Sequence, residues 1–413
     1  MKFLFDDESF SFEALRAAGF ANYGGADLGE VLVTAQAIPD GDEAAWHREW
    51  KATAVRVEAL ARQSLQGGHA VSAREAFLRA SNYYRTAEFY RRDDPVNDPE
   101  VRELSQLSRE TFTGAMDLFD FGFEPVSIPY KGTTLPGYLY LVDDSATPRP
   151  TVIYNSGYDS TLEESYFAIA AAALARGYNV LAFDGPGQGG ALREQHLVFR
   201  PDWEAVITPV VDFALTRREV SPEQISVFGY SLGGYLVARA AAFEKRIAAV
   251  ILDDGVYDAY GAITRMLPPF LTGWIDENND AAAIPVISMM MAHNTQLRWA
   301  IRNGLWTMGL DTIADLPREF ARYTLAGVAE QITAAVLVLD AENDQFFKGQ
   351  PQLAAQAMTN AKVTLTTLTE AEGAGEHCHM GAMGRAHQTI FDWLDQTLPQ
   401  ANQAPSSRSS CAS

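Results

Sequence analysis

The segment at residues 227–236 reads "VFGYSLGGYL" and puts a serine where a predicted strand meets a predicted helix. The run "ISVF" is short and apolar, and the following "GYLVARAAAFEKR" is helical in pattern. Gly229, Ser231 and Gly233 fit the motif G-x-S-x-G, whose small flanking residues allow a tight turn that lifts the serine hydroxyl above the sheet. The context therefore predicts that Ser231 is a nucleophile rather than part of an ordinary strand-helix turn.

A nucleophilic serine requires a base, because its hydroxyl is weakly nucleophilic at neutral pH. The base requires a carboxylate, and in folds with this turn the chain order is serine, acid, histidine. The histidines after Ser231 are His293, His377, His379 and His387. His293 precedes the last predicted strands, and His387 lies in the helical pattern "RAHQTIFDWLDQTL", where we expect a solvated face. The base is therefore expected in "GEHCHMGA", residues 375–382.

The same segment admits a metal interpretation, because Cys378 lies between His377 and His379. A metal needs a third ligand nearby, and in an extended segment the two histidines share a face while Cys378 points away. Nothing else in the region has metal-ligand spacing, so we expect no metal. We expect Cys378 to be a small buried filler.

The acid should follow a strand between the serine and the histidine. The run "VLVLDAENDQFF" ends a predicted strand at Asp340 and continues into a turn with Glu342 and Asp344. We favour Asp344 as the acid and interpret the other two as strand-end and solvated residues. Asp254, in "ILDDG", is the alternative, because the preceding strand also ends at the site.

Acyl chemistry also needs N–H donors for a developing oxyanion. One should be the amide of Leu232, and the other the amide of Tyr158 in the loop "NSGYDSTLEES", where Gly157 allows a close backbone approach. The turn "FDGPGQGG", residues 183–190, lacks both the Lys-Ser/Thr of a P-loop and the G-x-G-x-x-G spacing. We interpret it as a turn that shapes the mouth of the site.

The chain from about residue 121 alternates strands with helices. The first two runs, "FEPVSIPYKG" and "TTLPGYLYLVDD", predict an antiparallel pair around a Lys-Gly turn. Short apolar runs separated by helical segments then predict a parallel sheet covered on both faces. These runs are "TVIYN", "NVLAFD", "ISVFGY", "AAVILDD", "AAVLVLD" and "KVTLTTL". The fold class is therefore α/β, with a mostly parallel eight-stranded sheet.

Two helical regions accompany this sheet. Residues 1–120 hold three amphipathic patterns and no convincing strand, which predicts a small helical domain. Residues 121–398 form the α/β domain, with an insertion at about 256–330 that is rich in Met and Trp. The insertion is either a second apolar helical pack or a lid whose inner face lines an apolar substrate pocket.

Composition limits the classes of partner. There are 32 Lys and Arg against 53 Asp and Glu, and the net charge of −21 argues against a nucleic-acid or anionic-membrane surface. The start "MKFLFDDESF" has no apolar core of a signal peptide, and no run approaches the ~20 apolar residues of a membrane helix. Only two cysteines occur, and Cys411 lies in the tail at 399–413, which is disordered in composition. A reducing, cytoplasmic compartment fits best.

The assembled motifs resemble a branch of the α/β-hydrolases that includes 2,6-dihydroxypseudooxynicotine hydrolase, fungal polyketide-shortening pigment hydrolases and FrsA-like proteins. The shared segments, in order, are "GYDSTLEE", "DGPGQG", "GYSLG" and "GAGEHC". The helical "ASNYYRTAEFY" at 80–90 is also similar, so the resemblance spans most of the chain. It implies an α/β-hydrolase fold with a helical N-terminal cap and a lid.

The resemblance puts the nucleophile on Ser231, the acid on Asp344 and the base on His377, with Tyr158 and Leu232 at the oxyanion hole. His379 becomes a neighbour that lines the pocket or packs on the loop. One departure is Ser156-Gly157, where many relatives have Gly-Gly. The resemblance also implies that the protein uses no cofactor, acts on a small-molecule substrate and forms a homodimer.

We therefore expect a serine hydrolase that cleaves an acyl bond, either C–C beside a ketone or ester, in an apolar, aromatic or polyketide-like substrate. The alternatives are a general carboxylesterase or lactonase and, in another class, a non-catalytic FrsA-like regulatory binding protein. The expected pocket residues are Tyr83, Tyr84, Arg85, Trp274, Met290 and His379. For the first three, packing of one helix on the main domain is an equally good interpretation.

Overall fold

A computed structural model of the chain describes residues 2–398, so the expected tail at 399–413 lies outside the described residues. The described part contains one eight-stranded sheet with the order β1-β2-β4-β3-β5-β6-β7-β8. β1 and β2 pair antiparallel, β2 pairs antiparallel with β4, and all other pairs are parallel. The bounds are β1 Gly122–Tyr130, β2 Thr133–Leu141, β3 Arg149–Asn155, β4 Asn179–Phe183, β5 Val220–Tyr230, β6 Ala249–Asp253, β7 Ala335–Ala341 and β8 Val363–Leu368. The predicted α/β fold with a mostly parallel eight-stranded sheet is confirmed.

Alternate residues of the central strands enter two different cores, as the two-residue period of a strand requires. Phe228, Ile251 and Leu337 pack on the side shared with α16 (Met383–Thr397) and the N-terminal helices. Val227, Val250 and Val338 pack on the opposite side, against α8 (Glu204–Leu215) and α9 (Gly233–Ala241). Both faces are therefore covered, which explains why these strands appear in the sequence as continuous apolar runs.

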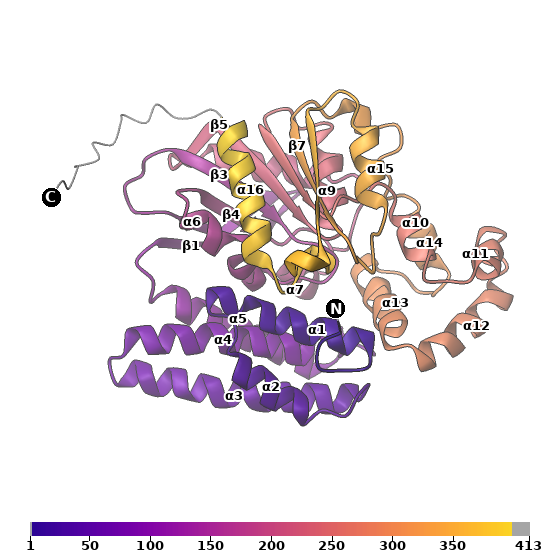
Figure 1. Cartoon of the computed structure of the whole chain (residues 1–413), viewed down its shortest axis with the longest axis horizontal. Coiled ribbons are helices and arrows are strands. Elements are labelled where there is room, and N and C mark those ends of the chain that lie inside the picture. The colour runs from indigo at the N-terminus through magenta and orange to yellow at the C-terminus, as the bar shows by residue number, and fades with distance from the viewer. Residues whose placement is uncertain (1, 399–413) are drawn as a thin grey trace.

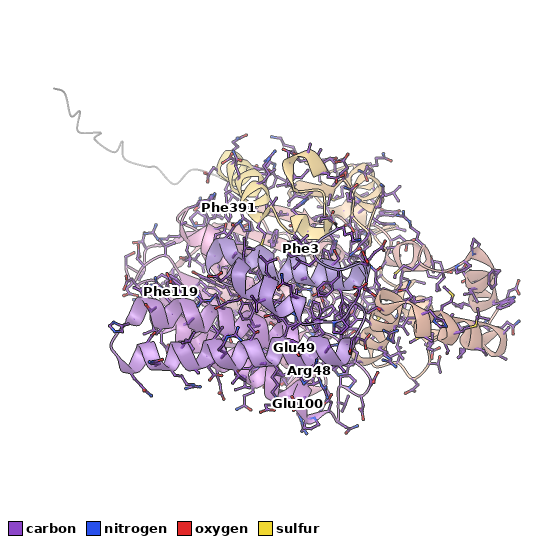
Figure 2. All side chains as sticks on the ribbon, turned by 60° about the horizontal axis from the view of Figure 1, so that its bottom comes forward. Phe3, Arg48, Glu49, Glu100, Phe119 and Phe391 are labelled. Carbon is purple, nitrogen blue, oxygen red and sulfur yellow. The ribbon has the colours of Figure 1, made fainter. Side chains whose placement is uncertain are left out.

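The N-terminal region is helical, and Figure 1 shows it as a layer beside the strand-bearing part. Its main helices are α1 Glu8–Gly19, α2 Leu28–Gln36, α3 Glu43–Gln66, α4 Ala70–Glu88 and α5 Pro99–Met116. The three amphipathic patterns correspond to α3, α4 and α5. Figure 2, turned toward this layer, shows Arg48, Glu49 and Glu100 on its outer side, whereas Trp46 and Trp50 are fully buried.

Helix α1 was not predicted, and its surroundings explain why. Every residue from Ser9 to Ala18 is buried, including the charged Glu13 and Arg16, so the polar residues of this helix do not mark a solvent-exposed face. Its start is marked only by Asp7, whose side chain accepts a hydrogen bond from the Phe10 amide. This helix is the part of the N-terminal region that reaches the candidate site.

The insertion between β6 and β7 consists of helices that extend to one side of the sheet (Figure 1). They are α10 Ala259–Thr264, α11 Pro269–Asp276, α12 Asp280–His293, α13 Thr295–Met308 and α14 Asp315–Phe320. Helix α13 joins the insertion to the N-terminal layer, because the Trp299 ring stacks on Phe89 at 4.4 Å and its indole N–H donates to the Phe89 carbonyl. None of the helices within residues 2–398 is long and apolar enough to cross a membrane.

Candidate active site

Ser231 lies in the turn between β5 and α9 with a φ of +60°, in the left-handed region that non-glycine residues rarely adopt. The flanking glycines allow this turn because side chains would not fit. A Cβ on Gly229 would lie 2.2 Å from the Gly233 carbonyl oxygen, and a Cβ on Gly233 would lie 2.6 Å from the Asn155 carbonyl oxygen. The G-x-S-x-G spacing therefore follows from backbone packing, and it holds the serine at the edge of the sheet.

His377 contacts this serine: its Nε2 lies 2.9 Å from Ser231 Oγ. The imidazole is buried, with the rings of Phe346 at 4.8 Å and Phe347 at 5.6 Å from its centroid. Residues His377–His379 form a 3-10 turn rather than an extended segment. Cys378 is buried as expected, but its Sγ lies 3.4 Å from His377 Nε2 instead of pointing away.

Two carboxyl groups, not one, meet the other nitrogen of the imidazole. His377 Nδ1 lies 3.0 Å from Asp344 Oδ2 and 2.8 Å from Asp254 Oδ2. The favoured acid and its alternative are therefore both present, one after β7 and one after β6. Asp344 Oδ1 also accepts the amides of Phe346 at 2.6 Å and Phe347 at 3.0 Å, whereas the buried Asp254 Oδ1 accepts no hydrogen bond from the described residues.

These environments divide the two acids into different protonation states. Burial and the neighbouring Asp344 charge raise the pKa of Asp254 well above its ordinary range. Burial also opposes the charge on Asp344, but His377, a hydrogen bond from Asp254 and the Phe347 amide outweigh it and lower the pKa of Asp344. Asp344 is thus the ionised partner of His377, and Asp254 is the neutral acid beside it.

The expected oxyanion-hole residues lie beside the nucleophile, where Leu232 is the N-cap of α9 and Tyr158 follows β3. Gln188 orients the second of these amides, because its Nε2 donates to the carbonyls of Ser156 at 2.7 Å and Gly157 at 3.0 Å. In a trans peptide the N–H points opposite to the carbonyl, so the Tyr158 N–H is directed away from Gln188. The turn "FDGPGQGG" therefore orients the loop after β3 by hydrogen bonds from Gln188, a role that its sequence did not reveal.

Gly157 sets the distance between this loop and the nucleophile. A Cβ there would lie 2.7 Å from the Tyr230 carbonyl oxygen and 2.8 Å from Ser231 Cβ. Gly157→Ala should therefore push the loop away and lower kcat by about 10²-fold, the loss expected for one oxyanion donor. Steady-state kinetics on an aryl ester would measure the loss. Gly273→Ala is the control, since a Cβ at Gly273 meets no atom within 4 Å; equal rates for the two variants would contradict the prediction.

A cavity opens at Ser231 and holds about 880 Å³ of space free of protein atoms, part of it continuous with solvent. This size suits a small-molecule ligand. Its apolar wall comes from α1, the insertion and the acid turn, and includes Phe12, Ile263, Met266, Trp299, Phe320 and Phe346. Tyr158, Leu232, His377 and Cys378 also line it, and Glu13, Arg16 and Asp159 form a charged part.

The residues expected to line the pocket lie outside this cavity. Tyr83 and Tyr84 are buried within the N-terminal layer, where their hydroxyls donate to Glu30 and Glu58. Arg85 lies behind the cavity wall and binds Glu13 and Asp159. Trp274 and Met290 lie on α11 and α12, away from the cavity lining. The prediction was wrong in its residues because α1, which was not predicted, occupies the place assigned to α4.

His379 does not line the pocket either. It is fully buried, its Nδ1 donates to the Ala374 carbonyl at 2.8 Å, and its Nε2 lies 3.3 Å from Asp253 Oδ1. Burial disfavours its charge, but Asp253 raises the pKa of His379 to about 9. The expected solvated face for His387 is also wrong, because this side chain is buried between Tyr23 Oη at 2.6 Å and the Ala168 carbonyl at 2.7 Å.

Two groups of described residues bring potential metal-ligand atoms within 4.8 Å of one another: Asp254, His377 and Cys378, and Asp253, Asp254 and His379. In the first, the 2.8 Å between Asp254 and His377 is a hydrogen-bond distance, shorter than the roughly 3.3 Å between ligands of a tetrahedral zinc. In the second, both ring nitrogens of His379 already have partners, because Nδ1 donates to the Ala374 carbonyl and Nε2 faces Asp253 Oδ1. Both groups fit hydrogen-bonded acid-base pairs better than a metal site.

The chain is similar to known proteins in sequence and in fold. Residues 155–388 match the Alpha/beta hydrolase family, and residues 39–262 match the Esterase FrsA-like family. Hydrolase LUC6 of Fusarium sp is 36% identical over 411 residues, covering 96% of this chain and 98% of its own. The 20-hydroxy-prefusarin hydrolase FUS2 of Gibberella moniliformis is also 36% identical, covering 96% and 98%. The crystal structure of 2,6-dihydroxy-pseudo-oxynicotine hydrolase shares the fold with a TM-score of 0.72 and 22% identity, over 92% of this chain and 95% of that one.

Proposed function

The chain belongs to the α/β-hydrolase family, and on that premise we propose that it is a cofactor-free serine hydrolase with the triad Ser231, His377 and Asp344. The observation that carries the proposal is the continuous line of contacts from Ser231 Oγ through His377 to Asp344, at 2.9 Å and 3.0 Å. A serine-imidazole-carboxylate chain of this geometry is what acyl transfer requires.

The mechanism follows from the positions of these groups. His377 Nε2 takes the Ser231 proton as Oγ attacks a carbonyl carbon, and Asp344 stabilises the imidazolium that forms. The amides of Leu232 and Tyr158 stabilise the tetrahedral oxyanion. Its collapse breaks the bond to the leaving group, which takes the proton from His377. Water, deprotonated by the same imidazole, then releases the acid and restores Ser231.

The substrate should be a small, largely apolar molecule of polyketide type. The aromatic and aliphatic wall of the cavity supports an apolar body. A polyketide-type substrate is supported by the name of the related 20-hydroxy-prefusarin hydrolase. Cleavage of a C–C bond beside a ketone and cleavage of an ester or lactone use the same triad. The match to an esterase family supports ester cleavage.

We also propose that the protein is a homodimer, which light scattering would test.

Labelling with a fluorophosphonate probe tests the triad. The wild-type protein should be labelled at Ser231, and Ser231→Ala should not be labelled, because only an activated serine reacts rapidly with such a probe. Mass spectrometry of the modified peptide identifies the residue. No labelling of the wild type would reject the proposed enzymatic function and favour a regulatory binding protein of FrsA-like type.

A paired assay separates the two bond types. Simple aryl esters would be compared with a β-diketone and an acyl-aromatic ketone, with product release measured for each. Ester turnover without ketone cleavage would reject C–C cleavage and leave a carboxylesterase or lactonase. Ketone cleavage that is lost in Ser231→Ala would establish the C–C reaction.

A further inference from the structure

The cavity has a charged edge that the triad does not use. It belongs to a buried cluster in which two arginines, Arg16 on α1 and Arg85 on α4, meet three carboxylates. Arg16 lies 2.8 Å from both Asp159 and Glu164, and Arg85 lies 3.0 Å from Glu13, 3.3 Å from Asp159 and 3.2 Å from Glu164. The cluster therefore has one acid more than it has bases.

Glu13 is the least satisfied acid of this cluster, and it lines the cavity. Its Oε2 accepts from Arg85, but its Oε1 has Arg16 Nη1 only at 3.7 Å, beyond hydrogen-bond distance. Burial raises the pKa of Glu13, and Asp159 adds to the shift, against the two guanidinium groups. The Glu13 Oε1 is therefore available to a ligand in the cavity, and the direction of the pKa shift favours the protonated carboxyl, which can donate.

A second polar group lies in the same lining. Tyr230 precedes the nucleophile and is only 4% exposed, yet its hydroxyl has no hydrogen-bond partner among the described residues. A buried hydroxyl without a partner is costly, and most such groups in folded proteins are satisfied. Two residues of the largely apolar cavity lining, Glu13 on α1 and Tyr230 on β5, thus carry polar groups that the protein itself leaves incompletely hydrogen-bonded.

We propose that Glu13 and Tyr230 form a polar subsite that binds an uncharged oxygen of the substrate, a ketone or hydroxyl on the acyl chain. This inference rests on the proposed hydrolase function and narrows its substrate class to oxygenated apolar acyl compounds. A neutral oxygen fits better than a carboxylate, because both arginines of the cluster already bind its own carboxylates and leave no unpaired cation for an anionic ligand. Glu13 donates to this oxygen in its protonated form, which its burial favours, and the Tyr230 hydroxyl donates to a ketone or accepts from a hydroxyl.

The test compares p-nitrophenyl esters of a plain acyl chain with esters of the same length that carry a ketone at carbon 4, 5 or 6. For each variant the measured quantity is the ratio of kcat/KM for the keto ester to that for the plain ester. In Tyr230→Phe and in Glu13→Leu the ratio for the best keto ester should fall about tenfold, the factor for one buried hydrogen bond. Glu13→Gln keeps a donor and should retain the ratio within about threefold.

Tyr154→Phe is the matched control, because it removes a neighbouring buried hydroxyl that does not line the cavity. Its ratio should equal that of the wild type. If Glu13→Leu does not fold, Tyr230→Phe still tests the proposal, because it deletes only an oxygen that has no protein partner among the described residues. Ratios in Tyr230→Phe and Glu13→Leu that match the wild type would overturn the subsite.

The result that would reject the proposed hydrolase function differs from the result that would overturn the subsite. It fails if the wild type hydrolyses no ester or ketone and Ser231 is not labelled by the fluorophosphonate. If Ser231 is labelled but neither ester is hydrolysed, protection from labelling by a ketone and by its methylene analogue supplies the same ratio. Equal protection by the two would overturn the subsite while leaving the triad in place.

Discussion

His377→Ala should lower kcat/KM by about 10⁴-fold or more, whereas His379→Ala should cost little in rate. Only His377 contacts the nucleophile, with Nε2 2.9 Å from Ser231 Oγ. Without it no group accepts the serine proton, and loss of the base removes most of the rate advantage of a triad. His379 faces Asp253 and the Ala374 carbonyl instead. Kinetics on one aryl ester would compare the two variants.

The His379 variant should show its effect in stability. Removing an imidazolium leaves the buried Asp253 without its partner, which costs about 3 kcal/mol. Because the pKa of His379 in the folded protein, about 9, exceeds the 6.5 of a free histidine, this stabilisation is complete below pH 6.5 and is lost as the pH rises through 9. Urea unfolding at pH 6 and pH 9.5 would measure the difference from the wild type, which should shrink at the higher pH.

Two other outcomes for these variants would contradict the assignment of His377 as the base or the purely structural role of His379. A large rate loss in His379→Ala together with a small one in His377→Ala would place the base two residues later. A loss of rate in both variants with retained folding would show that the Asp253–His379 pair acts on the triad through the shared turn.

The sequence predicted those parts of the site that depend on local geometry. Ser231 needs glycines on both sides because backbone carbonyls, including that of Asn155, pack closely against its turn. This requirement appears in the sequence as the G-x-S-x-G motif. Asp344 is recognisable because it lies in the turn that follows the buried strand β7. The central strands were predictable because both faces of the sheet are covered there, which makes each of them a continuous apolar run.

Features created by tertiary contacts left no such signal. Glu13 reaches the cavity because α1 is buried against it, and charged residues of a helix predict a solvent-exposed face rather than a cavity wall. Gln188 acts through two carbonyls more than thirty residues earlier in the chain. Asp254 was ranked as the alternative acid, but the sequence could not show that both acids meet one nitrogen of His377.

Asp344→Asn and Asp254→Asn should separate the roles of these two acids. Asp344→Asn should lower kcat by about 10⁴-fold, because an amide cannot stabilise the imidazolium and favours the wrong tautomer. Asp254→Asn should cost less than about tenfold, because it replaces a neutral acid by a neutral amide of the same shape. The assay is kcat on the best substrate, with far-UV circular dichroism to confirm folding of both variants.

Stability against pH supplies an independent measurement for Asp254. Its raised pKa means that the folded protein keeps a proton that the unfolded chain loses near pH 4. The wild type is therefore destabilised relative to Asp254→Asn as the pH rises above 4, up to the folded pKa. The difference in unfolding free energy between variant and wild type should move in favour of the variant from pH 4 to pH 8. If instead Asp254→Asn abolished activity and Asp344→Asn did not, Asp254 would be the ionised acid and the amides of Phe346 and Phe347 would serve only to hold the turn.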